Sequence, residues 1–180
     1  MKGNGNHIGT LFEKLFFYCI PTSGLRTQYI IKHKNKFHHI GEKLFYQPRK
    51  FPTDPELISI GNNVKISSGV EFINHDIIHS MINDKIGESI IKPYSAPIQI
   101  DDNVMIGANV LIMPNVRICS DVIIAAGSIV TKDISCSGVY GGVPAKYIKS
   151  LEEFMDKRNK NDSKNDSDCL WKYFYKNHCL

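Results

Sequence analysis

The sequence predicts a mainly β fold in which the chain winds into a coil of six-residue repeats. Two observations carry this prediction: a six-residue period of apolar residues over 98–134, and turn-forming residues between them. The apolar positions in one phase are Ile100, Ile106, Ile112, Ile118, Ile124 and Val130. An α-helix repeats every 3.6 residues or so and a strand about every two, whereas a period of about six returns one apolar side chain inward at each corner of a coil.

The positions between these apolar residues suit the corners of such a coil. The segments 101–103, 107–109 and 114–115 are rich in Asp, Asn, Gly and Pro. These residue types tolerate tight turns or left-handed backbone conformations. The same register appears upstream at Ile60, Ile66 and Phe72, so the coil is expected to include both segments.

The repeats resemble those of the hexapeptide-repeat acyltransferases, and they are most similar to those of the sugar and capsular-polysaccharide O-acetyltransferases. The residues that carry the resemblance are IGNNVKISSGVEFINHD, PIQIDDNVMIGANVLIMPNVRICSDVIIAAGSIVTKDI and VYGGVPAK. The resemblance implies a left-handed β-helix of triangular section, with three hexads per coil. It also implies a homotrimer that uses acetyl-CoA as co-substrate.

Three regions are expected along the chain. Residues 1–57 form a helical cap and lead-in, 58–149 form the β-helix acyltransferase domain, and 150–180 form a C-terminal helix, a polar linker and an aromatic tail. An open end of a β-helix exposes apolar core and unpaired backbone, so a covering element is expected there.

The N-terminal region carries the signals of two helices. Thr10 and Glu13 form a capping box before apolar residues at helical spacing, and a second helix is expected over about 25–37. That second stretch is rich in Lys and His, which indicates a solvated face or attraction to an anionic lipid surface or an acidic glycan. The segment 44–56, with three prolines, is predicted to be an irregular lead-in.

The repeats stop after His75 and resume at Ile98, so about 22 residues leave the coil. A loop of that length is usually functional, although a disordered insertion is the alternative. The resemblance implies that this loop, at about 76–97, reaches over the neighbouring subunit and walls the active site.

The C-terminal region is predicted to begin with a short helix at the capping box Ser150–Glu153 and to end near Arg158. Residues 159–168 are too polar to fold alone. The aromatic segment 169–180 has helical spacing at Trp171, Phe174, Tyr175 and His178. That helix is expected to pack on its own trimer or to contact a membrane edge or partner.

Composition narrows the class of protein. The net charge of +4 lacks the basic density of a nucleic-acid-binding protein. Five cysteines without a CxxC pair suggest neither a disulfide framework nor a zinc site, so a cytoplasmic location is expected. His75 and His79 are the only histidines between His39 and His178, so no catalytic metal is expected.

The strongest catalytic candidates stand in Asn74-His75-Asp76, where the repeat opens into the loop. A sugar hydroxyl is a weak nucleophile until a base removes its proton, and a histidine with an ordinary pKa of about 6.5 suits that role. The resemblance also implies one such His. Asp76 or Glu71 could orient the imidazole, and Asn74 could hold the acceptor or support the developing oxyanion.

The resemblance places acetyl-CoA at small-residue corners and nearby lysines. The candidates are Ala108, Ala126, Thr131, Lys132 and Lys146, with Lys146 of the GVPAK motif expected at the phosphorylated adenosine end. Backbone at small residues can come close to a pantetheine arm, and a lysine can contact phosphates.

We therefore expect an acetyl-CoA-dependent O-acetyltransferase that acts on a sugar or polysaccharide precursor by direct attack, with His75 as general base. Three enzymatic alternatives stay open: a serine, an antibiotic or an amino-sugar N-acetyltransferase of the same fold. A non-catalytic repeat scaffold is the alternative of a different class.

Overall fold

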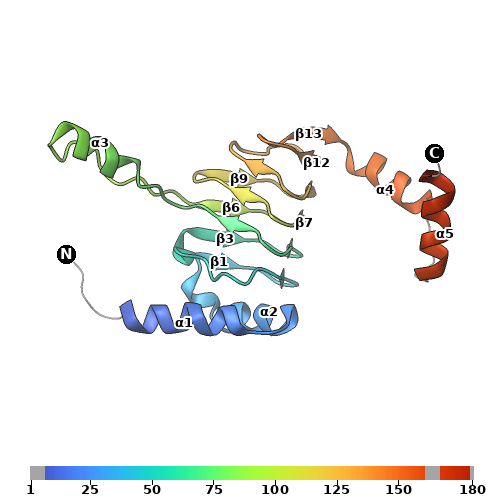
Figure 1. The fold of residues 1–180 in the computed structure, drawn as a ribbon, viewed down its shortest axis with the longest axis horizontal. Coiled ribbons are helices and arrows are strands. Elements are labelled where there is room, and N and C mark those ends of the chain that lie inside the picture. The colour runs from blue at the N-terminus through green and yellow to red at the C-terminus, as the bar shows by residue number, and fades with distance from the viewer. Residues whose placement is uncertain (1–6, 161–166, 179–180) are drawn as a thin grey trace.

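The computed structural model describes residues 7–160 and 167–178, and Figure 1 shows a stacked coil with helices at both ends and an arm on one side. The helices are α1 (His7–Cys19), α2 (Ser23–Lys32), α3 (Ile78–Ile86), α4 (Leu151–Lys160) and α5 (Ser167–His178), with short 3-10 helices η1 (Lys34–Lys36) and η2 (Pro55–Leu57). The strands are β1 (His39–Ile40), β2 (Phe45–Tyr46), β3 (Ile58–Ile60), β4 (Lys65–Ile66), β5 (Glu71–Phe72), β6 (Ile98–Ile100), β7 (Val104–Ile106), β8 (Leu111–Ile112), β9 (Val116–Ile118), β10 (Val122–Ile124), β11 (Ile129–Val130), β12 (Gly138–Gly141) and β13 (Lys146–Lys149).

The strands form three sheets, which are the three faces of the coil. The first sheet is β1-β3-β6-β9, the second is β13-β12-β10-β7-β4-β2, and the third is β11-β8-β5. All pairs are parallel except β12 with β13, which closes the C-terminal end as an antiparallel hairpin. Ile98 pairs with Val116 and Val104 with Val122, so equivalent positions stand 18 residues apart. The predicted left-handed β-helix with three hexads per coil is therefore confirmed.

The predicted apolar phase forms the core of this coil. The side chains at 100, 106, 112, 118, 124 and 130 are at most 1% exposed. They stack in register from one coil to the next, because each pairs with its equivalent in a neighbouring strand. Stacked Ile and Val side chains form the buried interior of the coil, and close packing of such side chains is typical of protein interiors.

The corner between the first and second sheets shows why Asn and Asp alternate with the apolar residues. Asn63, Asn103 and Asp121 have left-handed φ angles of 55°, 58° and 61°. Their side chains form a ladder in which Asn63 Nδ2 donates to Asn103 Oδ1 and Asn103 Nδ2 donates to Asp121 Oδ1, both at 3.0 Å. Gly61 is required nearby, because a Cβ there would lie 2.8 Å from the backbone carbon of Asp101.

The coil begins earlier than the sequence suggests. β1 pairs with β3 and β2 pairs with β4, both parallel and in register, and Tyr46 of β2 is buried. The prediction of an irregular lead-in over 44–56 is therefore wrong for β2, although the prolines do leave residues 47–54 without regular structure. Ile40 and Tyr46 pair with residues 20 positions further on, so they fall outside the six-residue phase that marks the later strands.

The cap closes the N-terminal end of the coil, as predicted. Phe17 is fully buried against the rings of Tyr29, Tyr46 and Phe51. The second helix ends at Lys32 and is followed by η1, so it is shorter than the expected 25–37. Its N-cap is Thr22, whose hydroxyl accepts a hydrogen bond from the Leu25 amide at 3.3 Å.

Glu13 fixes α1 to the rest of the cap. Its carboxylate accepts hydrogen bonds from the Tyr29 hydroxyl at 2.9 Å and from Lys36 Nζ at 2.5 Å. Burial by itself acts to raise the pKa of Glu13, but these two donors together lower that pKa below its ordinary value. Burial and the neighbouring Glu13 raise the pKa of Tyr29 to about 12.

The insertion after His75 forms an arm with α3 near its tip (Figure 1). At its base His75 and Ser95 form an antiparallel bridge, and the Ala96 amide donates to the Asn74 carbonyl at 2.8 Å. The arm exposes apolar side chains, including Ile77, Ile78 and Met81. The alternative expectation of a disordered insertion is wrong, because the insertion contains α3 and a paired base.

The C-terminal region carries the two expected helices. α4 continues to Lys160, two residues beyond the expected end, and α5 includes the aromatic positions. The predicted polar linker falls mostly on residues 161–166, which lie outside the described residues. Within the described part of the chain, no helix combines the length and apolar character needed to cross a membrane.

Candidate functional site

The candidate site lies at one edge of the coil, which we name the loop corner. It is the edge between the third and first sheets, formed by residues 52–55, 73–75, 113–115 and 131–133 in successive coils. Here β5 ends, the arm leaves and the chain returns as β6. His75 is therefore held by a strand below it and by the paired base of the arm.

His75 makes a hydrogen bond that the sequence did not reveal. Its Nδ1 lies 2.5 Å from Oδ2 of Asp54, which comes from the preceding coil at the same corner. A carboxylate can only accept, so Nδ1 carries the hydrogen and Nε2 is left as the basic nitrogen. The His75 side chain is 43% exposed and Asp54 is 25% exposed, so a substrate can reach the imidazole while its partner is more sheltered.

The two carboxylates that were predicted to orient His75 have other partners, and that prediction is wrong. Asp76 Oδ1 accepts a hydrogen bond from the Ile78 amide at 3.0 Å, in the turn that precedes α3. Glu71 is paired with Lys50 at 2.5 Å. Consecutive residues on extended backbone point to opposite sides, which explains why Asp76 turns away from its neighbour. Asp54 takes the role instead.

Asn74 is a structural residue of the arm base. Its side chain is 3% exposed, and Nδ2 donates to the carbonyl oxygens of Ala96 at 3.1 Å and Leu57 at 3.4 Å. Both amide hydrogens are used inside the protein, so they are not free to hold an acceptor or an oxyanion. The expectation of such a contact is corrected: Asn74 fixes the chain on either side of His75.

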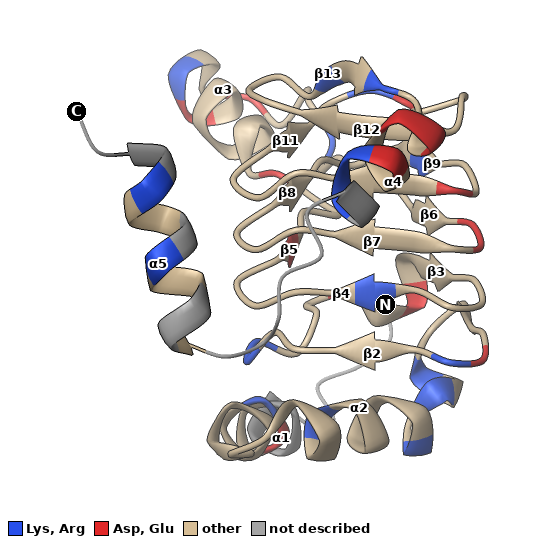
Figure 2. Cartoon of the chain, turned by 90° about the vertical axis from the view of Figure 1, so that its right-hand side faces the viewer, with Lys and Arg blue, Asp and Glu red and all other residues tan. Residues whose placement is uncertain are grey.

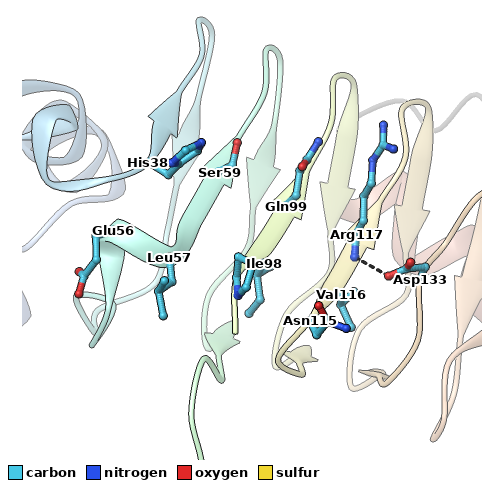
Figure 3. A pocket seen from close by; sticks show the side chains of 11 residues that line it. His38, Glu56, Leu57, Ser59, Ile98, Gln99, Asn115, Val116, Arg117 and Asp133 are labelled. Atoms are coloured by element: carbon cyan, nitrogen blue, oxygen red, sulfur yellow. Dashed lines mark hydrogen bonds between the residues drawn. The ribbon is translucent and has the colours of Figure 1, made fainter. Parts of the chain in front are cut away.

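A groove of about 440 Å³ opens on the first sheet beside the loop corner. Figure 3 shows Ser59, Gln99 and Arg117 side by side on the neighbouring strands β3, β6 and β9. Leu57 and Pro97 also line the groove. Asn74 donates hydrogen bonds to the carbonyl oxygens of Leu57 and of Ala96, which precedes Pro97, so the groove reaches the base of the arm. Its other polar side chains are His38, Glu56, Asn115 and Asp133.

Three charged residues in and beside this groove are held in place by hydrogen bonds. Arg117 Nη2 donates to Asp101 Oδ2 at 2.7 Å, and the Arg117 amide donates to Asp133 Oδ1 at 2.8 Å. Burial acts to raise the pKa of Asp101, but hydrogen bonds from Arg117 and Gln99 hold that pKa below its ordinary value. The groove thus presents fixed polar groups that can pair with hydroxyl groups of a ligand.

The cofactor candidates divide between two corners. Ala108 and Ala126 lie between the second and third sheets, at a corner formed by 67–70, 107–110 and 125–128, which we name the small-residue corner. A Cβ on Gly107 would lie 2.5 Å from the Ala126 amide nitrogen, so coils can stack here only with a small residue. Ala126 is exposed, which leaves its backbone open to a ligand.

Thr131 and Lys132, by contrast, are exposed at the loop corner, at the same edge as His75 but in a later coil. Lys146 is exposed at the start of β13, in the hairpin that ends the coil. A single chain therefore does not bring all five candidates to His75. Ala108 and Ala126 lie across the width of the third sheet from the loop corner.

The described residues contain no group of three or more His, Cys, Asp or Glu side chains that could hold a metal ion. His79 lies in the first turn of α3, away from any such cluster, and its Nδ1 is buried without a described hydrogen-bond partner. His75 has a carboxylate partner instead of a second histidine.

Sequence reasoning missed Asp54, the residue whose carboxylate is hydrogen-bonded to the His75 imidazole. The signal that could have found it is spacing: Asp54 stands 21 residues before His75, close to the coil period of 18 with a few residues added at the prolines. The prediction that residues 44–56 are irregular obscured this spacing, because it placed no coil before Ile58.

Comparison with known proteins shows what the repeats and the fold are similar to. The bacterial transferase hexapeptide family (six repeats) matches residues 97–132. Galactoside O-acetyltransferase of Escherichia coli (strain K12) is 38% identical over 117 residues, which cover 64% of this chain and 55% of that protein. The 2,3,4,5-tetrahydropyridine-2,6-dicarboxylate N-acetyltransferase of Staphylococcus aureus (strain JH9) is 44% identical over 68 residues, or 37% of this chain and 28% of that protein.

A solved structure has the same fold. It is a hexapeptide-repeat containing acetyltransferase from Vibrio cholerae O1 biovar eltor, complexed with acetyl coenzyme A. Its TM-score is 0.57 at 23% sequence identity, with 84% of this chain and 92% of that chain covered. This chain spans about half of the galactoside enzyme and about a quarter of the N-acetyltransferase.

Proposed function

Because residues 97–132 of this chain carry the repeat of the bacterial transferase hexapeptide family, we propose that the protein transfers the acetyl group of acetyl-CoA to a hydroxyl group of a sugar or glycan acceptor. The observation that carries the proposal is the exposed His75–Asp54 pair at the mouth of the arm. The identity to a galactoside O-acetyltransferase supports the acceptor class.

In this mechanism Nε2 of His75 removes the proton of the acceptor hydroxyl as its oxygen attacks the thioester carbonyl. The tetrahedral intermediate then collapses, the C–S bond breaks, and the imidazolium returns the proton to the departing CoA sulfur. Asp54 holds the Nδ1 hydrogen and stabilises the imidazolium that forms between the two steps. A positioned base of this kind contributes about 10²- to 10⁴-fold in rate.

The groove on the first sheet is the proposed acceptor site. It begins beside the loop corner and is lined by amide, hydroxyl, carboxylate and guanidinium groups, which can pair with sugar hydroxyls. Arg117 and Asp133 are already fixed by hydrogen bonds within the coil, so little side-chain freedom is lost when a ligand binds. An acceptor placed there would present a hydroxyl toward the corner that carries His75.

The complete site is proposed to lie between subunits of a homotrimer. Within one chain the small-residue corner and the loop corner lie on opposite edges of the third sheet, whose outward side chains include Leu111 and Ile129. A heterologous contact repeated about a three-fold axis would close into a ring. It would bring Ala108 and Ala126 of one chain opposite His75 of the next, with Lys132 and Lys146 available for phosphate groups.

The experiment that tests the function is release of free thiol from acetyl-CoA in the presence of a panel of acceptors. The panel contains galactosides, maltose, acidic oligosaccharides, serine, an aminoglycoside and an amino sugar, and the product is identified by NMR. We expect an O-acetylated sugar, and we expect His75→Ala to lower the rate by about 10² or more. His39→Ala, another exposed histidine, is the matched control and keeps full activity.

Other results would change the assignment. An N-acetylated or serine product would identify one of the enzymatic alternatives, and thiol release by His75→Ala within a few-fold of wild type would remove His75 from the mechanism. Failure of every acceptor to stimulate thiol release would favour the non-catalytic scaffold.

A further inference from the structure

We propose that the cap formed by α1 and α2 is a docking surface for a bilayer of anionic phospholipids. The cap lies at the N-terminal end of the coil and contributes no residue to the candidate site. Membrane docking therefore stands independently of acetyl transfer, and each can fail without the other.

The first observation is an apolar face on α1. Leu11, Phe12, Leu15 and Phe16 are 68%, 67%, 58% and 61% exposed. They stand at i, i+1, i+4 and i+5, so they share one side of the helix, while Phe17 on the other side is fully buried in the cap. Four large apolar side chains left together in water on one side of a helix indicate a surface that something covers.

The apolar face continues onto α2. A groove of about 400 Å³ runs between the two helices and is lined by Phe16, Ile20, Leu25, Tyr29 and Lys32, among others. Figure 1 shows α1 and α2 lying across the end of the coil. The two helices therefore offer one broad surface rather than a narrow slot for a single side chain.

The second observation is charge. Residues 1–40 contain six Lys and Arg and a single acid, Glu13. Glu13 already binds Lys36 and Tyr29, so no carboxylate in this region is left to repel a negative surface. Figure 2 shows basic positions on the cap helices.

Three of the lysines lie on the cap helices or directly after them. Lys14 follows Leu11 by three residues and so lies beside it on the helix surface, Lys32 lines the groove, and Lys34 is exposed in η1. Lysine side chains can lay their aliphatic stems along apolar surface and carry the ammonium group to the headgroups. This combination of Phe and Leu beside Lys is that of a helix lying in a membrane interface.

Charge also decides between the possible occupants. A second copy of this cap would bring one group of lysines against another, and like charges at an interface are unfavourable. An anionic bilayer satisfies both halves of the surface at once, because its acyl boundary takes the apolar side chains and its headgroups take the lysines.

The test is binding of the full chain to sonicated vesicles, measured by flotation. One set contains phosphatidylcholine alone and the other contains phosphatidylcholine mixed with phosphatidylglycerol. We expect binding to the mixed vesicles, weakened by added salt, and much weaker binding to phosphatidylcholine alone. Leu11→Ser with Phe12→Ser should lower the partition coefficient at least about tenfold, since two exposed apolar anchors are removed.

The charge variant is Lys14→Gln, Lys32→Gln and Lys34→Gln together. We expect it to lower binding to the mixed vesicles about 100-fold, at roughly fivefold per lysine, and to have little effect with phosphatidylcholine. The matched control removes the same charge elsewhere, by Lys85→Gln, Lys92→Gln and Lys157→Gln, and should bind like the wild type. All variants should keep the circular-dichroism spectrum of the wild type, and the two cap variants should also keep its thiol release with a soluble acceptor.

Three results would overturn the proposal. The first is that the wild type and the cap variants bind equally well to both types of vesicle in the flotation assay. The second is an equal loss in the control variant, which would make the attraction a property of net charge. The third is a change of sedimentation coefficient in Leu11→Ser/Phe12→Ser without vesicles, which would show that another copy of the chain covers the face.

Discussion

Replacing Asp54 by Asn tests the pairing on which the proposed mechanism depends. The change keeps the size of the side chain but removes the negative charge, so the coil should fold as before. With Asn the Nδ1 hydrogen is no longer specified, because the amide can either accept from Nδ1 or donate to it. Part of the protein would then carry the hydrogen on Nε2 and lose its base.

The size of the effect follows from the geometry. A hydrogen bond to a charged group is worth about 1.5–3 kcal/mol, which corresponds to a loss of about tenfold to 150-fold in kcat. Because His75 is 43% exposed and Asp54 is 25% exposed, water weakens the pair and the lower half of that range is expected. The KM for acetyl-CoA should stay the same, since Asp54 acts through His75 and does not contact the cofactor.

The assay is thiol release over a range of acetyl-CoA concentrations, with the acceptor identified above. Glu71→Gln and Asp76→Asn are the matched controls. They remove the two carboxylates that are nearest to His75 in the sequence but that bind other groups, Lys50 and the Ile78 amide. We expect both to stay within a few-fold of wild type. A kcat for Asp54→Asn within threefold of wild type, or an equal loss in either control, would refute the assignment of Asp54.

Three further predictions concern the cofactor, the cap and the assembly. Lys146→Ala should raise the KM for acetyl-CoA with little change in kcat, because a phosphate contact is made equally in the ground and transition states, and steady-state kinetics measure both. Glu13→Gln should lower the free energy of unfolding by about 1–2 kcal/mol at pH 7, with Lys36 left unpaired. Because the folded pKa of Glu13 is lowered, its contribution is full above the ordinary carboxyl pKa and is lost as pH falls through the folded value, so urea unfolding at acid pH should show no difference. Refolding His75→Ala together with an inactive Ala126→Trp variant should restore part of the activity if the site is shared, and the absence of rescue in mixed trimers would mean that each chain carries a complete site.

The coil could be predicted from the sequence because its cause is local and repeated. Each hexad places one Ile or Val inward, and the core positions at 100, 106 and 112 follow directly from that period. The corners could be predicted for the same reason, since Asn103 occupies the left-handed conformation that its residue type tolerates. These features need no knowledge of which segments meet in space.

The first coil could not be predicted, because its strands stand out of phase with the later repeats: Ile40 and Tyr46 pair with residues 20 positions further on, whereas the later coils repeat every 18. β1 and β2 have two residues each, and Pro48, Pro52 and Pro55 stand between β2 and β3. What holds these strands is pairing with β3 and β4, which is a relation between segments about 20 residues apart. A pattern of residue types within one segment contains no trace of that pairing.

The prediction of the carboxylate that orients His75 was wrong for the same reason, because the true partner comes from a distant segment of the sequence. Sequence reasoning searched for an orienting carboxylate among the neighbours of His75 in the chain, and extended backbone points those neighbours away. In a coil, however, the neighbours of a corner residue are the residues one turn before and after it. Asp54 becomes the partner of His75 only because the first coil exists and lies directly below the arm base. The strands β1 and β2 therefore do more than extend the cap. By adding one coil beneath His75, they supply the carboxylate that, in the proposed mechanism, leaves Nε2 free to act as a base.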